Sequence, residues 1–229
     1  MPVQARRNPG YGTTLLVAPR AIPLPRRVPA SWAAAKRCID VAGALLGLVL
    51  AAPFILLSAI AIMFVSPGSP FFAQERVGQD GRRFRLYKLR TMVDGAHLHH
   101  ERLQPLSEVS GPVFKMRNDP RLHALGGLLR RTSVDELPNF VNVLRGEMSL
   151  VGPRPPLPSE VEHYDRFALR RLSVKPGLTC LWQISGRSNV DFETWMELDN
   201  QYVDSWTPWG DVAIILRTIP AVIRGEGAH

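Results

Sequence analysis

Residues 41–65 read VAGALLGLVLAAPFILLSAIAIMFV and form the longest apolar run of the chain, uninterrupted by any charged residue. As a helix this run would extend about 37 Å, whereas the hydrocarbon core of a bilayer is about 30 Å thick. The run is too long and too far from residue 1 to be the apolar part of a signal peptide, and no small-residue cleavage site follows it. We therefore expect a membrane helix over residues 32–66.

Two features of this helix favour a re-entrant course over a plain crossing. Pro53 lies at the middle of the run, where it removes a helix hydrogen bond and kinks the axis. Both flanks are basic, and basic residues prefer the cytoplasmic side of a membrane. They comprise Arg26, Arg27, Lys36 and Arg37 before the run, and Arg76, Arg82, Arg83 and Arg85 after it. A helix that bends at Pro53 and returns keeps both flanks on the cytoplasmic face; an ordinary kinked span and a buried core helix are the alternatives.

The composition indicates an anionic partner. The 229 residues carry a formal net charge of +8, which suits nucleic acid, acidic lipid or a phosphorylated substrate. Arginines recur beside glycine, proline and acidic residues rather than in one tail, which favours a phosphate site over a nucleic-acid stripe. Cys38 and Cys180 are the only cysteines, so we expect neither a zinc site nor a disulfide framework.

Residues 1–31 are rich in proline and arginine and contain no acidic residue. This composition predicts a disordered basic arm. The arm either binds anionic lipid headgroups or is a passive extension.

The residues that follow the membrane helix predict a β-hairpin. The segments 71–77 and 83–90 flank a turn sequence, Gly-Gln-Asp-Gly, at 78–81. The second segment alternates basic and apolar residues as a half-buried strand does, so Arg83, Arg85 and Lys88 share its polar face. A solvated face is the simpler interpretation for Arg83, whereas Lys88 and Arg90 are open to a role in substrate binding.

Helices are expected over most of the remaining chain. Their predicted ranges are 121–131, 135–145, 159–172 with a Ser159–Glu162 capping box, 191–206, and 210–223 interrupted by Pro220. Gly146 is expected to stop the second of these helices. The tryptophans of the last third, Trp182, Trp195, Trp206 and Trp209, belong either to the core or to an interfacial belt. His97, His99 and His100 are interpreted as solvated rather than as metal ligands, because no carboxylate or cysteine lies at matching spacing.

An adjacent acidic pair, Asp135 and Glu136, lies five residues after Arg130 in RRTSVDELP. The plain interpretation is a helix N-terminus, with Asp135 as the N-cap and Glu136 as a first-turn acid. The same position suits catalysis, since a carboxylate can attack phosphorus and Mg²⁺ typically takes one or two protein carboxylates. Arginines neutralise phosphate charge during transfer, and Arg130, Arg131 and Arg154 are the local supply.

A series of ordered motifs closely resembles the bacterial sugar transferase family, the monotopic polyprenyl-phosphate phosphoglycosyltransferases. The resemblance covers about residues 32–227. Its motifs are SPGSP at 66–70, QERVG at 74–78, YKLRTM at 87–92, KMRNDP at 115–120, RRTSVDELP at 130–138, GEMSLVGPRP at 146–155, KPGLT at 175–179 and WQISGR at 182–187. The chain resembles the short form of the family, without a large N-terminal region of transmembrane helices.

The resemblance implies an α/β fold: a mostly helical small cytosolic domain over 67–229 with a short β-hairpin, and an N-terminal re-entrant membrane helix broken at Pro53. It implies that this domain rests on the cytoplasmic face of the bacterial inner membrane. The implied reaction moves a hexose 1-phosphate from a UDP-sugar to undecaprenyl or another polyprenyl phosphate, with Mg²⁺, and starts the assembly of exopolysaccharide or another glycoconjugate.

The family's motifs also imply residue roles. Asp135 matches the nucleophile that forms a phosphosugar intermediate, and Glu136 matches its partner; both are expected at the metal. Arg130 and Arg154 match phosphate-binding arginines, and we add Lys88, Arg90 and Arg187 to the expected substrate-binding set.

Two alternative functions and the identity of the sugar stay open alongside this expectation. A non-enzymatic membrane anchor would explain the charge and the apolar run but not the acidic pair among arginines. Direct glycosyl transfer would release a nucleoside diphosphate instead of a monophosphate. The sequence does not name the sugar or the nucleotide, although the last third of the chain resembles the family branch linked to glucose or galactose phosphate. We expect no nucleic-acid partner, and a dimer through the apolar C-terminal helix is one option for the oligomeric state.

Overall fold

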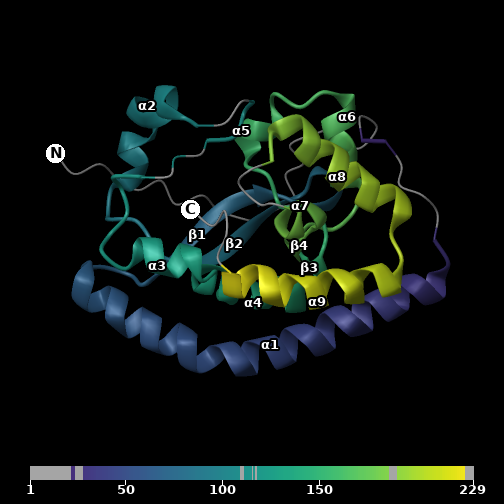
Figure 1. The fold of residues 1–229 in the computed structure, drawn as a ribbon, viewed down its shortest axis with the longest axis horizontal. Coiled ribbons are helices and arrows are strands. Elements are labelled where there is room, and N and C mark those ends of the chain that lie inside the picture. Colours follow the sequence, from purple (N-terminus) through teal and green to yellow (C-terminus); the bar gives the residue numbers. More distant parts are fainter. Residues whose placement is uncertain are drawn as a thin grey trace, which may run out of the picture.

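The computed structural model describes residues 22–23, 28–108, 111–114, 116, 118–185 and 190–224, without the side chains of 97, 100, 101 and 223. Most of the expected basic arm at 1–31 and the expected ligand Arg187 lie outside these residues. In Figure 1 one long helix forms an arc beneath a domain of short helices and two small sheets.

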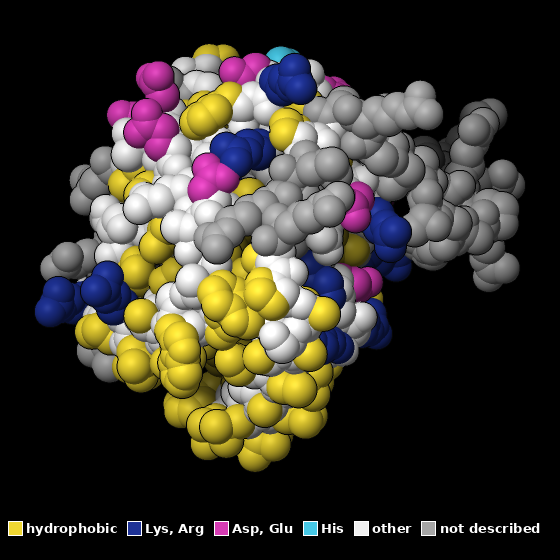
Figure 2. Space-filling view, turned by 90° about the vertical axis from the view of Figure 1, so that its right-hand side faces the viewer, with side chains coloured by type: hydrophobic (Ala, Val, Ile, Leu, Met, Phe, Trp, Pro, Cys, Tyr) yellow, Lys and Arg dark blue, Asp and Glu magenta, His cyan; other side chains and the backbone are white. Residues whose placement is uncertain are grey.

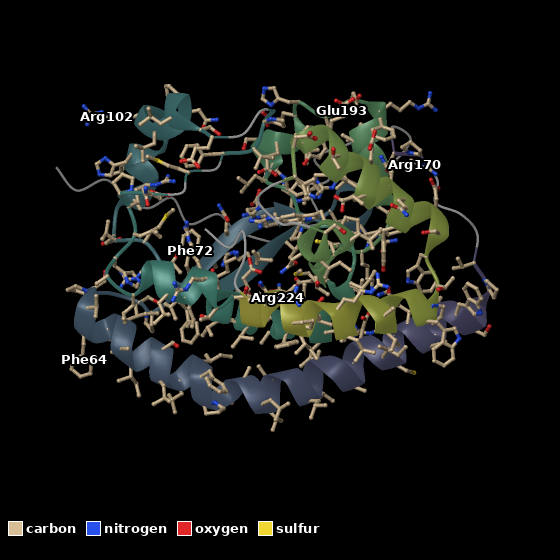
Figure 3. All side chains as sticks on the ribbon, viewed as in Figure 1. Phe64, Phe72, Arg102, Arg170, Glu193 and Arg224 are labelled. Atoms are coloured by element: carbon tan, nitrogen blue, oxygen red, sulfur yellow. The ribbon has the colours of Figure 1, made fainter. Side chains whose placement is uncertain are left out.

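The long helix, α1, spans Ala30–Val65 and continues through Pro53. It is long and apolar enough to cross a membrane. A narrow face, which includes Ala44, Ala51 and Ile62, is buried against the domain, while many of its large apolar side chains are exposed. Phe64, at its C-terminal end, is 87% exposed and projects away from the domain (Figure 3). Figure 2 shows the apolar side chains gathered on this underside of the molecule.

Polar contacts hold the N-terminal half of α1 on the domain. The Lys36 ammonium donates to the Val151 carbonyl at 3.0 Å and to Asp211 Oδ2 at 2.5 Å. Asp40 is buried and accepts hydrogen bonds from the Ser149 hydroxyl and the Leu150 amide. Because buried charges are costly unless paired, these contacts require α1 to lie in one register on the domain.

The predicted β-hairpin is confirmed. β1 (Phe71–Val77) pairs antiparallel with β2 (Arg83–Leu89), with Phe71 opposite Leu89 and Val77 opposite Arg83. The turn contains a short 3₁₀ segment, η2 (Gln79–Gly81), in which Asp80 adopts a left-handed φ of 58°. β2 buries Phe84 and Leu86, as its alternating sequence predicts, but the alternation ends at Tyr87 and Leu89 is buried as well. Lys88 therefore does not share the exposed face of Arg83 and Arg85, as we expected, and is half-buried.

A second small sheet was not predicted. β3 (Ser149–Val151) pairs in parallel with β4 (Gly177–Thr179), a segment that we expected to be a loop. The two chain segments approach closely beside this sheet: a Cβ on Gly152, just after β3, would lie 2.3 Å from the carbonyl oxygen of Lys175, just before β4. Long-range pairing of three residues leaves too short a pattern for sequence reasoning to detect.

Two predicted helices are shorter or divided in the structure. Residues 121–125 form a turn, and only α3 (Gly126–Arg131) is helical, because the 121–123 backbone bonds to residues 91 and 93 instead. Residues 159–172 divide into α5 (Pro158–Val161), α6 (Arg166–Leu169) and η6 (Arg170–Ser173), since Asp165 caps a new helix. The capping contact of α5 joins the Leu157 amide to Glu160, so the predicted Ser159–Glu162 box is wrong.

The helix predicted over 135–145 begins as a 3₁₀ segment, η5 (Val134–Asn139), and continues as α4 (Phe140–Arg145). Gly146 ends it in a left-handed conformation with φ 79°, which confirms the predicted stop. α4 packs on α1, where Gly47 leaves room for the Phe140 ring.

The remaining elements of the domain are short helical segments and the two C-terminal helices. η3 (Ala96–His99), α2 (His100–Leu103) and η4 (Gln104–Leu106) lie on the side away from α1, and α7 (Leu181–Ile184) precedes the two last helices. α8 (Phe192–Ser205) confirms the predicted acidic helix, and α9 (Pro208–Arg224) passes through Pro220 without interruption. Trp182 and Trp195 pack together and Trp206 lies against the main core, whereas Trp209 is 82% exposed. The core hypothesis therefore holds for three of the four tryptophans.

Candidate active site

The acidic pair lies in η5, directly after α3. Ser133 adopts a left-handed φ of 57°, which turns the chain between the two elements, and the Glu136 amide donates to the Ser133 carbonyl at 3.2 Å. Ser133 rather than Asp135 occupies the N-cap position, and no side-chain cap is formed there. The N-cap interpretation of Asp135 is therefore wrong, and this residue, only 6% exposed, is buried without capping the helix.

β2 supplies a cation to this pair. The Lys88 ammonium donates to Glu136 Oε1 at 2.6 Å, and both side chains are partly buried. Burial alone would raise the pKa of Glu136, but the charges of Lys88 and Arg154 outweigh it and lower the pKa to about 2. Glu136 is therefore fully ionised at neutral pH.

The pKa of Asp135 is shifted in the opposite direction, upward. Burial and the charge of Glu136 raise its pKa to about 6, against the opposing charges of Lys88, Arg130 and Arg154. A carboxylate of this kind is mostly ionised at pH 7, yet it is more basic than an exposed aspartate. Two neighbouring carboxylates with separated pKa values are typical of sites where the two groups have different roles.

Arg130 approaches the pair from the last turn of α3. Its Nε donates to the Thr91 hydroxyl at 3.2 Å, and burial lowers the pKa of its guanidinium against the raising effect of Asp135. Arg131, the next residue, is exposed. The structure therefore distinguishes Arg130, which acts on Asp135, from its exposed neighbour Arg131.

Arg154 lies in the Pro-rich loop after β3, and two buried arginines fix the backbone of that loop. Arg76 donates to the Pro155 carbonyl at 3.0 Å, and Arg171 donates to the Arg154 carbonyl at 2.8 Å. Arg171 is itself paired with buried Asp199 at 2.7 Å. Within the described part of the chain, the Arg154 guanidinium forms no side-chain hydrogen bond, so it is free to bind an anion.

Arg76 and Arg171 were not expected to contribute to the site. Arg76 stood in the QERVG motif and Arg171 in a predicted helix, but nothing in the sequence indicates that either guanidinium is buried. Both side chains donate to backbone carbonyls of the loop that carries Arg154, and they therefore hold this loop in place.

The profile of the family described as "Bacterial sugar transferase" matches residues 31–225. The chain belongs to the bacterial sugar transferase family. The matched range includes the hairpin, the acidic pair and the Arg154 loop.

Three relatives illustrate the membership of this sugar transferase. The chain is 45% identical to the galactosyl transferase CpsE of Streptococcus agalactiae, over 85% of this chain and 43% of the relative. It is 42% identical to the exopolysaccharide production protein ExoY of Rhizobium meliloti, over 85% of this chain and 88% of the relative. It is 42% identical to a UDP-galactose-lipid carrier transferase of Erwinia amylovora, over 85% of this chain and 41% of the relative.

The coverage differs between these relatives. The chain spans less than half the length of CpsE and of the Erwinia protein, but most of ExoY. Further relatives are named as transferases that act with undecaprenyl phosphate.

The structure brings together five of the seven residues expected in the site: Asp135, Glu136, Lys88, Arg130 and Arg154. Arg90 has a different environment, since its guanidinium donates to the carbonyls of Ser66 and Pro67 just after α1. It therefore ties the end of the long helix to β2. The seventh, Arg187, lies outside the described residues.

The donor set suits a hard divalent cation that shares its ligands with a substrate. Among the described residues, no three histidine, cysteine, aspartate or glutamate side chains come together. Mg²⁺ commonly takes only one or two carboxylates and fills its other positions with water and substrate phosphates. Asp135 and Glu136 meet that requirement, and Lys88 occupies only one oxygen of Glu136.

Proposed function

We propose that this sugar transferase moves a hexose 1-phosphate from a UDP-sugar to undecaprenyl phosphate through a covalent intermediate on Asp135. The observation that carries the proposal is the buried Asp135 with a pKa of about 6, beside ionised Glu136 and the cations Lys88, Arg130 and Arg154. The names of the relatives, which specify UDP-galactose, lipid carrier and undecaprenyl phosphate, support the substrate classes.

In the first step, an Asp135 oxygen attacks the phosphorus that carries the sugar. A new P–O bond forms to the carboxylate, the P–O bond to the bridging oxygen breaks, and uridine monophosphate leaves with that oxygen. Arg130 and Arg154 neutralise the phosphate oxygens as negative charge shifts to the leaving group. Burial of Asp135 strips water from the nucleophile and strengthens these interactions.

In the second step, a phosphate oxygen of the lipid attacks the same phosphorus. The bond to Asp135 breaks, the carboxylate is restored, and the product is a lipid diphosphate sugar. Because the two substrates use one site in turn, the reaction follows ping-pong kinetics.

Glu136 and Asp135 are the residues that would hold Mg²⁺, which supplies charge neutralisation to the diphosphate of the donor. Lys88 orients Glu136 by its 2.6 Å hydrogen bond and, together with Arg154 and Arg76, lowers the pKa of that carboxyl. These cations therefore keep a metal-binding carboxylate available at any pH where Asp135 can react.

We also propose that α1 is re-entrant in the bacterial inner membrane, with the domain on the cytoplasmic face. The basic flanks, Pro53 and the exposed apolar underside support this placement. Native Cys38 is exposed at the N-terminal flank, and Ser69→Cys in a Cys38→Ser background reports the other flank. Labelling of both from the cytoplasmic side with an impermeant maleimide is expected; labelling from opposite sides would refute the re-entrant course.

The catalytic proposal is tested by intact-protein mass spectrometry. The detergent-solubilised enzyme is mixed with Mg²⁺ and UDP-glucose or UDP-galactose, without lipid acceptor. A gain of one hexose phosphate is expected, and it should be absent in Asp135→Asn. Turnover by Asp135→Asn, or release of uridine diphosphate instead of the monophosphate, would contradict the covalent mechanism.

A further inference from the structure

A second cationic site lies at the far end of the hairpin from Lys88. It is a cavity of about 410 Å³ between the turn of β1 and β2, the C-terminal end of α4 and the start of the segment that leads into β4. Arg82, Arg83, Arg145 and Lys175 line it, together with Asp80 and Glu147. Arg83 and Lys88 lie at opposite ends of β2, roughly 17 Å apart along the strand, so this cavity is separate from the acidic pair.

Several charges of the cavity are already engaged. Arg83 pairs with Glu75 at 2.7 Å, Arg145 donates to the Tyr87 hydroxyl at 2.8 Å, and Glu147 accepts from buried Asn142 at 2.7 Å. These contacts hold the walls of the cavity in place. They leave Lys175 and Arg82 as the lining cations for which no side-chain partner is seen among the described residues.

Lys175 is the most informative of the lining residues. A Cβ on Gly146 would lie 3.6 Å from Lys175 Nζ and 3.7 Å from Arg37 Nη2, so the two cationic groups converge beside a residue without a side chain. Burial and the nearby charge of Arg37 lower the pKa of Lys175, and Asp40 only partly offsets this. Arg37 itself donates to the Val143 and Leu144 carbonyls at 2.7 and 2.8 Å, so it supplies charge to this place rather than a free donor. Asp40 and the lining carboxylates Asp80 and Glu147 are outnumbered by the cations, and a bound anion would stabilise the excess positive charge.

The position of the cavity relates it to the membrane helix. Arg37 lies one turn before the charge-free run begins at Val41, which is the level expected for lipid headgroups if α1 enters the bilayer as proposed. Figure 2 shows Lys and Arg side chains bordering the apolar underside on both sides. Arg37, whose guanidinium lies with Lys175 beside Gly146, therefore relates the charge of the cavity to that level.

We propose that this cavity binds the phosphate group of an anionic ligand, and that its position favours the headgroup of an anionic phospholipid over a soluble phosphate. Lys175 and Arg82 donate to the phosphate oxygens, Arg37 adds charge from α1, and the open space beside Gly146 admits the group. The assignment to a lipid rests on the membrane placement of α1 proposed above. Occupancy would link the hairpin, α4 and α1 at one end of the domain.

The test measures ligand binding by native mass spectrometry of the full-length protein in detergent, without nucleotide sugar. The probes are short-chain phosphatidylglycerol, phosphatidylcholine of the same chain length, and inorganic phosphate. The variants are Lys175→Gln, Arg82→Gln and the charge-preserving Lys175→Arg. Arg102→Gln is the matched control, because Arg102 is exposed on α2, on the opposite side of the domain from α1 (Figure 3).

We expect phosphatidylglycerol to bind in preference to phosphatidylcholine in the wild type and in Arg102→Gln. Lys175→Gln and Arg82→Gln should each weaken this binding by about tenfold, the factor that follows from one lost charge-assisted hydrogen bond, and Lys175→Arg should restore it. If inorganic phosphate binds with the same dependence and phosphatidylglycerol shows no preference, the phosphate site stands and its ligand is soluble.

Binding of both probes to Lys175→Gln and Arg82→Gln as tightly as to Arg102→Gln would overturn the proposal. Hexose-phosphate adduct formation is measured separately on the same preparations, and it also reports that each variant is folded. A wild type that forms no adduct but binds the lipid refutes the proposed function and leaves the cavity assignment intact.

Discussion

The ammonium group of Lys88 lies 2.6 Å from Glu136 Oε1 and also acts electrostatically on Asp135, so one cation controls both carboxylates of the site. Replacing Lys88 with methionine removes the charge that most strongly lowers the pKa of Asp135. We expect the pH at which adduct formation is half-maximal, near 6 in the wild type, to rise by about 1 unit or more. Glu136 stays ionised near neutral pH through Arg154 and Arg76. Lys88→Arg is the control, and an unchanged pH profile in Lys88→Met would argue against this coupling.

The two carboxylates should affect stability with opposite signs. The pKa of Asp135 is raised to about 6 on folding, so its charged form destabilises the fold progressively between about pH 4 and 6, and fully above that range. Asp135→Asn should therefore stabilise the protein at pH 8, by up to about 3 kcal/mol, and by less at pH 5.

Glu136 is the natural control for this measurement. Its pKa is lowered to about 2, so its ionised form stabilises the fold above its unfolded pKa, and that contribution is lost as the pH falls through about 2. Glu136→Gln should lower the thermal unfolding temperature at pH 8, whereas Asp135→Asn should raise it. Thermal unfolding is measured in one detergent at pH 5 and pH 8. A change of the unfolding temperature in the same direction for both variants at pH 8 would contradict the opposite pKa shifts of Asp135 and Glu136.

Arg130 and Arg131 form a matched pair for testing phosphate binding. Arg130 is partly buried, donates to Thr91 and acts on Asp135, whereas Arg131 is exposed. Arg130→Gln should slow adduct formation by about 100-fold, the usual effect of losing one group that stabilises transition-state charge. Arg131→Gln should remain within about twofold of the wild type, as surface substitutions do. Stopped reactions analysed by intact mass give both rates, and similar losses in the two variants would show that the effect is only one of net charge.

Sequence reasoning succeeded where a pattern extends over many residues. The apolar run at 41–65 predicted α1, and the alternation at 83–90 predicted β2. The acidic pair and Arg154 were identified from their residue types, and the structure adds the mutual electrostatics that give them separate roles.

Sequence reasoning failed where tertiary contacts override a local preference. Arg90 was placed in the expected substrate-binding set, but its guanidinium donates to the carbonyls of Ser66 and Pro67. β4 is defined by pairing with a strand more than twenty residues away, and such pairing leaves no periodic signal in three residues. The buried support of the Arg154 loop, Arg76 and Arg171, is invisible for the same reason, since burial is a property of the assembled domain.

The close contact between Gly152 and the strand β4 yields the last prediction. The Gly152 amide donates to the Thr179 carbonyl at 3.0 Å, and a Cβ at this position would lie 2.3 Å from the Lys175 carbonyl oxygen. Both neighbours are backbone, so they cannot move aside as a flexible side chain could. Gly152→Ala must therefore separate β3 from β4 and displace the loop that begins with Gly152 and carries Arg154.

We expect Gly152→Ala to destabilise the protein by about 1–3 kcal/mol, the usual range for overpacking, and to slow adduct formation as well. Gly127→Ala is the control, because a Cβ at Gly127, in α3, meets nothing within 4 Å and alanine favours a helix by up to about 1 kcal/mol. Thermal unfolding and adduct rates are measured on both variants. If Gly152→Ala unfolds at the wild-type temperature but loses adduct formation, the displacement is confined to the Arg154 loop; if both properties match the wild type, the close approach of the two strands is not a constraint on the site.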